Sequence, residues 1–112
     1  MHELSLCRSI ETIVCRAAGD RKVAVVELEV GALRQVVPTT LEHCWGLVTQ
    51  RTALAGSRLL VSYVPAVLVC DDCGATTTLD EWPIMKCGSC ASQAVRVTSG
   101  EEFTVTAIQL EV

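Results

Sequence analysis

Residues 70–90 read CDDCGATTTLDEWPIMKCGSC and contain two cysteine pairs, Cys70 with Cys73 and Cys87 with Cys90, separated by thirteen residues. Only two residues lie between the cysteines of each pair, so one tight turn can offer both sulfurs to a single metal ion. Two such turns supply four soft thiolate ligands in a tetrahedron, which is the arrangement zinc prefers in structural sites. Because four sulfurs leave no position open for water, we predict a structural zinc site.

The same four cysteines have two other possible uses. An all-sulfur tetrahedron also holds iron, which would make the chain a rubredoxin-like electron carrier. Free or disulfide-bonded thiols are the other alternative, but paired spacing in a chain without a recognisable signal peptide favours metal ligation. Gly74 follows the first pair and Gly88 lies inside the second. We expect both glycines to allow sharp bends of the backbone.

The segment 66–94 contains all four paired cysteines and differs in character from the rest of the chain. It is rich in loop-forming residues, and its few large apolar side chains include Val67, Leu68, Leu79, Trp82 and Ile84. So small a set buries little surface, whereas a bound metal can contribute on the order of 10 kcal/mol to folding. We predict that 66–94 is an inserted zinc-binding module of the zinc-ribbon type, in which Trp82 packs against protein rather than against a ligand.

The flanking residues, 1–65 with 95–112, predict a separate α/β domain. Helical and alternating apolar spacing indicates helices over 3–18 and 38–56 and strands over 22–30, 58–64 and 101–112. In the first helix the expected inward residues are Leu6, Ile10, Ile13, Val14 and Ala17. The predicted fold class is therefore α+β, with two helices packed on a three-stranded sheet and the zinc ribbon inserted before the last strand.

Three cysteines and one histidine lie among these predicted elements. Cys7, Cys15 and Cys44 stand in apolar surroundings. Because unpaired cysteine often behaves as a small apolar residue, we expect Cys7 and Cys15 to be buried. His43 lies within the second helix, and its neighbours predict an exposed position without a ligand role.

The composition excludes several classes of protein. The chain has 112 residues, half of them apolar, and a formal net charge of −4 with a pI near 5.0. A surplus of acidic residues disfavours nonspecific binding to nucleic acid, which requires Lys and Arg against the phosphates. The most apolar stretch, 64–69, is too short to span a bilayer and contains a proline. We expect a cytoplasmic protein.

Several motifs occur in an order that resembles one known family. They are Met1-His2-Glu3-Leu4-Ser5-Leu6, Glu29-Val30-Gly31 before Leu33, Val37-Pro38 before Leu41, the two cysteine pairs, and Gly100-Glu101-Glu102-Phe103 with Glu111-Val112. Together they resemble the HypA/HybF family of nickel metallochaperones for hydrogenase maturation, over essentially the whole chain. The opening residues and the distant four-cysteine module are the specific part. One departure is Gly88-Ser89 within the second pair, where many members carry proline.

The resemblance implies that His2 anchors Ni(II), together with the backbone of Met1 and Glu3. Coordination chemistry agrees with this role. The Met1 amine, the His2 amide nitrogen and the His2 imidazole can close fused chelate rings, and the amide nitrogen of Glu3 can join them. Such an all-nitrogen, square-planar set suits Ni(II). Without the resemblance, His2 would be read as a solvated residue near a helix start.

The resemblance also implies partners and excludes catalysis. The partners are a GTPase nickel-insertion accessory protein and the large subunit of [NiFe] hydrogenase, with urease as the destination in some organisms. Nickel is then transient cargo and zinc is structural. We predict that the chain is not an enzyme, since it shows no nucleophile with a base at diagnostic spacing and no phosphate-cradling glycine loop. The alternative is a zinc-ribbon adaptor for protein interaction or nucleic acid, and homodimer formation stays open.

Overall fold

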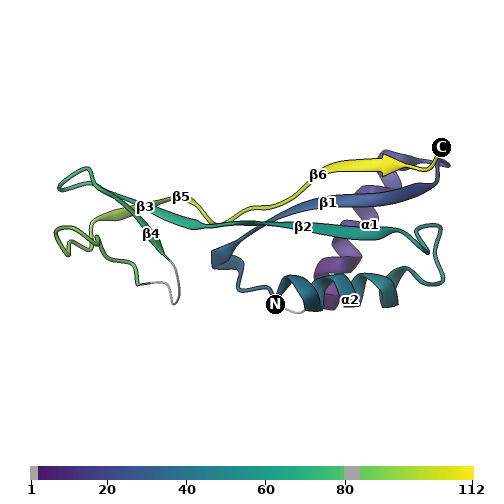
Figure 1. Ribbon diagram of the computed structural model, residues 1–112, viewed down its shortest axis with the longest axis horizontal. Coiled ribbons are helices and arrows are strands. Elements are labelled where there is room, and N and C mark those ends of the chain that lie inside the picture. The colour runs from purple at the N-terminus through teal and green to yellow at the C-terminus, as the bar shows by residue number, and fades with distance from the viewer. Residues whose placement is uncertain (1–2, 80–83) are drawn as a thin grey trace. The chain divides into compact units, whose positions relative to one another are not determined.

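The computed structural model describes residues 3–79 and 84–112, which form two α-helices, a 3-10 turn and six strands. The elements are α1 (Glu3–Ala18), β1 (Val23–Gly31), the 3-10 turn Ala32–Arg34, α2 (Pro38–Thr49), β2 (Arg58–Val64), β3 (Ala66–Cys70), β4 (Thr76–Leu79), β5 (Val95–Ser99) and β6 (Phe103–Leu110). The strands make two separate three-stranded sheets, with the orders β2-β1-β6 and β4-β3-β5 (Figure 1). The predicted α+β class with two helices is confirmed.

The chain divides into two compact units. Unit 1 comprises Met1–Glu29, Val36–Ser62 and Thr104–Val112, and unit 2 comprises Val30–Gln35 and Tyr63–Phe103. Both helices belong to unit 1, and all four paired cysteines belong to unit 2. No helix in the described part of the chain is long and apolar enough to cross a membrane.

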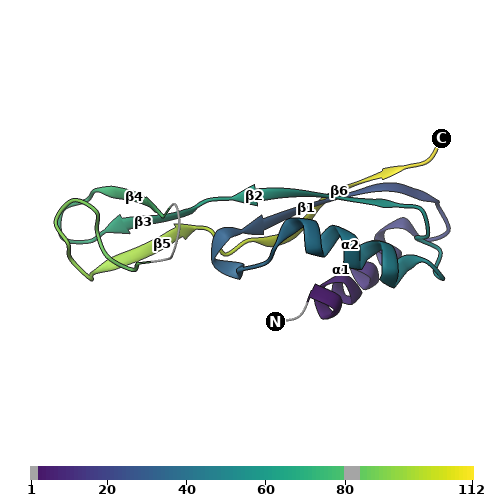
Figure 2. The same cartoon turned by 60° about the horizontal axis from the view of Figure 1, so that its bottom comes forward.

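The helix α1 has one apolar face, which lies on the same side of the β2-β1-β6 sheet as α2 (Figure 2). Its buried residues are Leu6, Cys7, Ile10, Val14 and Ala18. The predicted stripe is correct at Leu6, Ile10 and Val14 but wrong at Ile13 and Ala17, which are exposed. Because the inward face is centred on Ile10 and Val14, the 3.6-residue period brings Cys7 and Ala18 inward and turns the other two outward.

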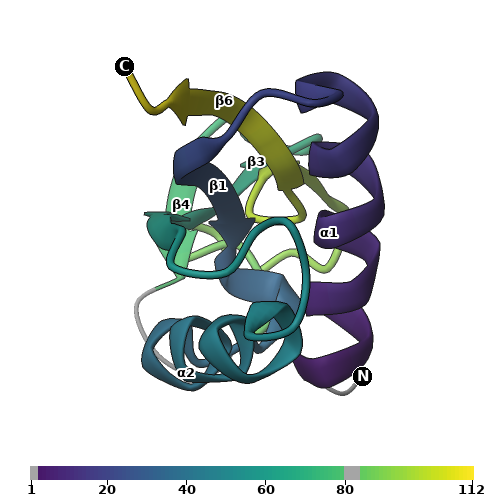
Figure 3. The same cartoon turned by 90° about the vertical axis from the view of Figure 1, so that its right-hand side faces the viewer.

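The second helix begins where the sequence predicts and ends earlier. Pro38 occupies its first turn, but the helix ends at Thr49 rather than at Gly56. The next residues form tight turns, in which the Thr52 amide donates to the Thr49 carbonyl at 2.9 Å. Gly56 does adopt a left-handed φ of 82°, and it closes these turns instead of the helix. Figure 3 shows the axes of α1 and α2 crossing.

The strand β1 supplies the centre of the first sheet. Val26, Leu28 and Val30 are buried, while Glu27 and Glu29 between them are only half-buried, so the predicted alternation is confirmed. In β6 the half-buried positions are Phe103, Val105 and Ile108, and the alternation therefore shifts after Val105.

The second sheet contains strands that the sequence does not predict, since 66–94 is expected to be a loop-rich zinc-ribbon module without assigned strands. β3 pairs antiparallel with both β4 and β5, and Leu68 lies opposite Thr77 on one side and Val97 on the other. Ala66, Leu68 and Cys70 form the buried face of β3. The segment escaped prediction because β4 is a short run of threonines, TTTL, which carries little apolar pattern.

A close contact between backbones lies within unit 2, where Gly31 and Gly100 meet. The Gly31 amide donates to the Glu102 carbonyl at 2.7 Å, and the Leu33 amide donates to the Gly100 carbonyl at 2.8 Å. A Cβ atom on Gly31 would collide with the Gly100 carbonyl, and a Cβ atom on Gly100 would lie 2.6 Å from the Ala66 Cα. Gly100 also has a φ of 112°, which disfavours any side chain.

We therefore predict that Gly100→Ala lowers the free energy of unfolding by about 3 kcal/mol, because overpacking against backbone adds to an unfavourable φ. Gly46→Ala is the matched control, since nothing lies within 4 Å of a Cβ atom at this α2 position. It should raise the free energy of unfolding by up to about 1 kcal/mol, owing to the higher helix propensity of alanine. Denaturant titrations of both variants measure these changes, and equal stabilities would contradict the contact.

Candidate metal centre

The two cysteine pairs converge in unit 2. The sulfur atoms of Cys70, Cys73, Cys87 and Cys90 all lie within 4.8 Å of one another. The Cys70–Cys90 and Cys73–Cys87 sulfur distances are both 3.6 Å. A tetrahedral zinc ion with Zn–S bonds of about 2.3 Å requires sulfurs about 3.8 Å apart. The four thiols therefore fit one zinc ion, with four protein ligands and no open position.

The first pair lies in a tight turn that follows β3. The Cys70 amide donates to the Ala75 carbonyl at 2.9 Å, and the Gly74 amide donates back to the Cys70 carbonyl at 3.0 Å. Gly74 has a left-handed φ of 75°, which turns the chain back so that the Ala75 carbonyl reaches the Cys70 amide. The role predicted for Gly74 is thus correct, and the reason is the absence of a Cβ atom.

The second pair repeats this turn with the same residue offsets. The Cys87 amide donates to the Ser92 carbonyl at 2.9 Å, and the Ala91 amide donates to the Cys87 carbonyl at 3.0 Å. The left-handed residue is Ala91, with a φ of 63°. The sharp bend predicted at Gly88 is therefore misplaced by three residues. The second turn keeps the geometry of the first although its left-handed position carries a methyl group.

Backbone amides point at the sulfur atoms within each turn. The amides of Ser89 and Cys90 donate to the Cys87 sulfur at 3.4 and 3.5 Å, and the Cys73 amide donates to the Cys70 sulfur at 3.5 Å. The amides of Cys90 and then Ser89 lower the pKa of Cys87 to about 6. The Cys87 sulfur is therefore largely a thiolate at neutral pH, ready to bind a cation.

The Cys90 thiol has the opposite tendency. The Ser92 amide lowers its pKa, but the neighbouring sulfurs of Cys73 and Cys70 outweigh that effect and raise the pKa of Cys90 to about 12. The thiols of Cys87 and Cys90 thus differ in how readily they lose a proton, and a bound cation would favour the thiolate form of both. Four like charges this close are stable only around a metal ion.

Polar contacts hold the turns against the second sheet. The Gly88 amide donates to the Thr77 hydroxyl of β4 at 3.0 Å, and the Arg96 guanidinium of β5 donates to the Asp71 carboxylate at 2.7 Å. The Ser92 hydroxyl donates to the Asp72 carboxylate. Proline at position 88 would lack the N–H group that reaches Thr77. This hydrogen bond gives Gly88 a local role in place of the bend first assigned to it.

The other predicted residues lie in unit 1 or outside the described residues. Cys7 is buried as expected, but Cys15 is exposed because it falls on the outer face of α1. His43 is exposed on α2, in agreement with the sequence. Glu3 is half-buried at the start of α1. Met1 and His2, predicted to bind nickel, lie outside the described residues.

These features define a class of protein, a small α+β protein with a closed four-cysteine metal centre. The family model described as "Hydrogenase/urease nickel incorporation, metallochaperone, hypA" matches residues 1–110. Hydrogenase maturation factor HypA of Geotalea uraniireducens is 40% identical over 111 residues, and that of Geobacter metallireducens is 37% identical over 115. Each alignment covers 99% of this chain and the full length of the relative. The chain belongs to the HypA family.

Solved structures share the same fold. The solution structure of the nickel metallochaperone HypA from Helicobacter pylori superposes with a TM-score of 0.66 at 18% identity, covering 98% of this chain and 97% of that one. A second HypA solution structure has a TM-score of 0.66 at 17% identity. The architecture is therefore retained although few residues are identical.

The metal centre predicts a clear difference between two cysteine variants. Cys73→Ser removes one of the four ligands and should abolish retention of zinc, because a weakly held ion does not survive dialysis against a chelator. Cys15→Ser removes an exposed thiol of α1 and should leave about one zinc ion per chain. Metal analysis of both proteins after expression with zinc measures this difference. Equal zinc contents would contradict the assignment.

Proposed function

We propose that this chain is a non-enzymatic carrier that binds Ni(II) at its N-terminal residues and delivers it to a maturing [NiFe] hydrogenase. The observation that carries the proposal is the family match, which extends over residues 1–110 and so includes Met1-His2-Glu3. The relatives named hydrogenase maturation factors align with 99% of this chain, which supports a shared role for the whole molecule.

The proposed nickel ligands are the amine of Met1, the amide nitrogen and imidazole of His2, and the amide nitrogen of Glu3. Fused chelate rings of this kind favour a square-planar d8 ion such as Ni(II). The site requires a free amine and the loss of amide protons, so nickel affinity should fall as the pH falls. A site built from the first residues of a chain can release its ion without unfolding a domain.

In this proposal the four cysteines hold a zinc ion with a purely structural role. The sulfur distances near 3.6 Å support zinc as the resident ion. With four sulfurs on the ion, no position is left for nickel or for a partner's ligand. The two metals are thus assigned to separate proposed domains. Zinc is assigned to the domain formed by 66–94, and nickel to the domain formed by 1–65 with 95–112.

The proposal includes a GTPase accessory protein and the hydrogenase large subunit as partners, in the reducing environment of the cytoplasm. The sequence contains no phosphate-cradling glycine loop, so nucleotide hydrolysis would have to come from the partner. The family description names urease beside hydrogenase, and urease is therefore a second client to test.

The test is a nickel titration of untagged, zinc-loaded protein. Removing a residue that only hydrogen-bonds to a metal ligand typically lowers metal affinity by about 10- to 100-fold. The variant His2→Ala removes a proposed ligand itself, so it should lower nickel affinity by more than about 100-fold. His43→Ala is the matched control, because His43 is exposed on α2 and should leave nickel affinity unchanged. Isothermal calorimetry gives both affinities and the stoichiometry, expected to be one nickel per chain.

Two results would overturn the nickel proposal. Equal nickel binding by wild type and His2→Ala would remove the N-terminal site. Loss of nickel binding in His43→Ala would place the site on α2 instead. Zinc content, measured on the same samples, should stay the same in all three proteins, because neither histidine is among the four proposed zinc ligands.

A further inference from the structure

A second pair of thiols lies within unit 1, where α1 packs against α2. The Cys7 side chain is fully buried, and its thiol donates across the helix interface to the Leu41 carbonyl at 3.5 Å. Leu41 lies on α2, three residues before Cys44. In a helix, side chains three residues apart lie one above the other on the same face. The Cys44 side chain therefore lies one helical turn along α2 from Leu41, whose carbonyl accepts the hydrogen bond from the Cys7 thiol.

The surroundings of Cys7 favour the protonated form of its thiol. Burial raises the pKa of Cys7 to about 11, and the nearby Cys44 thiol is the next largest cause, followed by Glu3. The Cys7 thiol is therefore protonated at neutral pH and held by the Leu41 carbonyl. Cys44 is only half-buried, so a small reagent can reach it more easily than Cys7.

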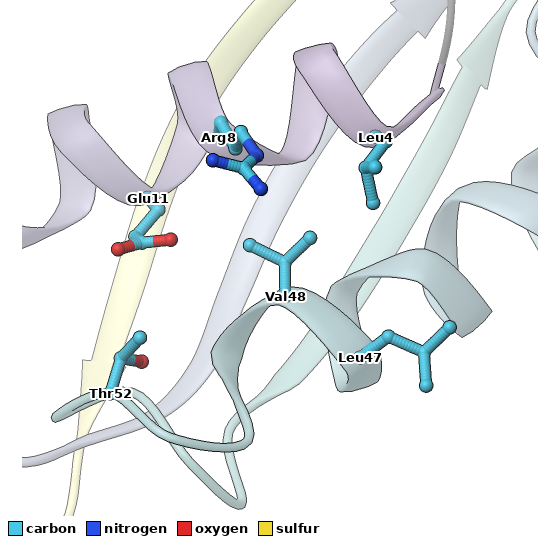
Figure 4. A pocket seen from close by; sticks show the side chains of 6 residues that line it. All are labelled: Leu4, Arg8, Glu11, Leu47, Val48 and Thr52. Atoms are coloured by element: carbon cyan, nitrogen blue, oxygen red, sulfur yellow. The ribbon is translucent and has the colours of Figure 1, made fainter.

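A groove of about 340 Å³ lies between the two helices (Figure 4). Its lining residues are Leu4, Arg8 and Glu11 of α1, with Leu47, Val48 and Thr52 of α2 and the turn after it. Arg8 and Val48 point toward each other across the gap in Figure 4. On α1, Leu4 and Glu11 lie one turn to either side of Cys7. On α2, Val48 lies one turn beyond Cys44. The groove therefore opens beside the helical turns that carry the two cysteines.

We propose that Cys7 and Cys44 are a redox-modification site, in which a hydroperoxide converts the two thiols into a reversible disulfide that links α1 to α2. The Cys44 sulfur attacks a peroxide oxygen, the O–O bond breaks, and water leaves when the oxidant is hydrogen peroxide. The Cys7 sulfur then attacks the resulting sulfenic acid. The S–S bond forms, the S–O bond breaks, and hydroxide departs with the Cys7 proton as a second water.

The balance of this reaction is two thiols and one hydrogen peroxide giving one disulfide and two waters. A dithiol reductant reverses it through a mixed disulfide. The proposal is independent of the nickel carrier function, since neither cysteine is among the proposed ligands. It is also separate from the zinc centre, because Cys7 and Cys44 lie in unit 1 and the four metal-binding cysteines lie in unit 2.

The experiment uses the untagged, zinc-loaded chain treated with hydrogen peroxide, alkylated and digested with trypsin without reductant. Cleavage after Arg8, Arg16, Arg34 and Arg51 puts Cys7, Cys15 and Cys44 on three different peptides. Mass spectrometry should find the peptide 1–8 joined to the peptide 35–51, with the loss of two hydrogens, and dithiothreitol should separate them. Cys15→Ser should give the same linked peptide, and Cys44→Ser should lose it and leave Cys7 alkylatable after denaturation.

Two results in the wild-type protein would overturn the proposal without reliance on any variant. One is oxidation of Cys44 to sulfinic acid while Cys7 remains a free thiol. The other is a linkage of Cys44 to Cys15 or to a zinc cysteine in place of Cys7. Zinc content measured before and after oxidation should be unchanged, which shows that the disulfide does not come from a dismantled metal centre.

Discussion

The convergence of four sulfur atoms on one tetrahedron is the constraint on which unit 2 depends. Its buried apolar residues are few, and two of them, Cys70 and Cys87, belong to the four-cysteine cluster. Burial of so few side chains cannot offset the conformational entropy of two long turns. Zinc binding to such sites contributes about 10–16 kcal/mol, as much as the whole stability of an ordinary domain. Unit 1 differs, because Ile10, Val14 and Trp45 give it an apolar core of its own.

The contrast between the two proposed metal sites follows from what each must do. A structural ion has to stay bound, and the two cysteine turns offer four sulfurs, backbone amides aimed at sulfur, and anchors to both neighbouring strands for this purpose. A transported ion has to leave, and ligands at the first residues of a chain can open without disturbing a core. The acidic net charge of −4 also disfavours contact with nucleic acid.

The sequence predicts those features of the molecule that depend on residues close together along the chain. Cysteine spacing indicated the metal centre, and apolar periodicity indicated α1 and the alternation of β1. Contacts between distant segments escaped it, such as the approach of Gly31 to Gly100, since no pattern near either glycine reveals its partner. β4 was missed because its run of threonines shows no alternation of apolar and polar residues, although threonine itself favours strands. The exposure of Cys15 and the left-handed Ala91 oppose the usual preferences of those residues, so only coordinates reveal them.

Amide hydrogen exchange on the protein before and after zinc removal tests the central claim most directly. The two amides to compare lie in the interiors of the two units, at Leu68 of β3 and Val14 of α1. If the metal holds unit 2 together, chelation should abolish protection at Leu68 and leave Val14 protected. Full protection at Leu68 in protein shown to be free of metal would contradict the account.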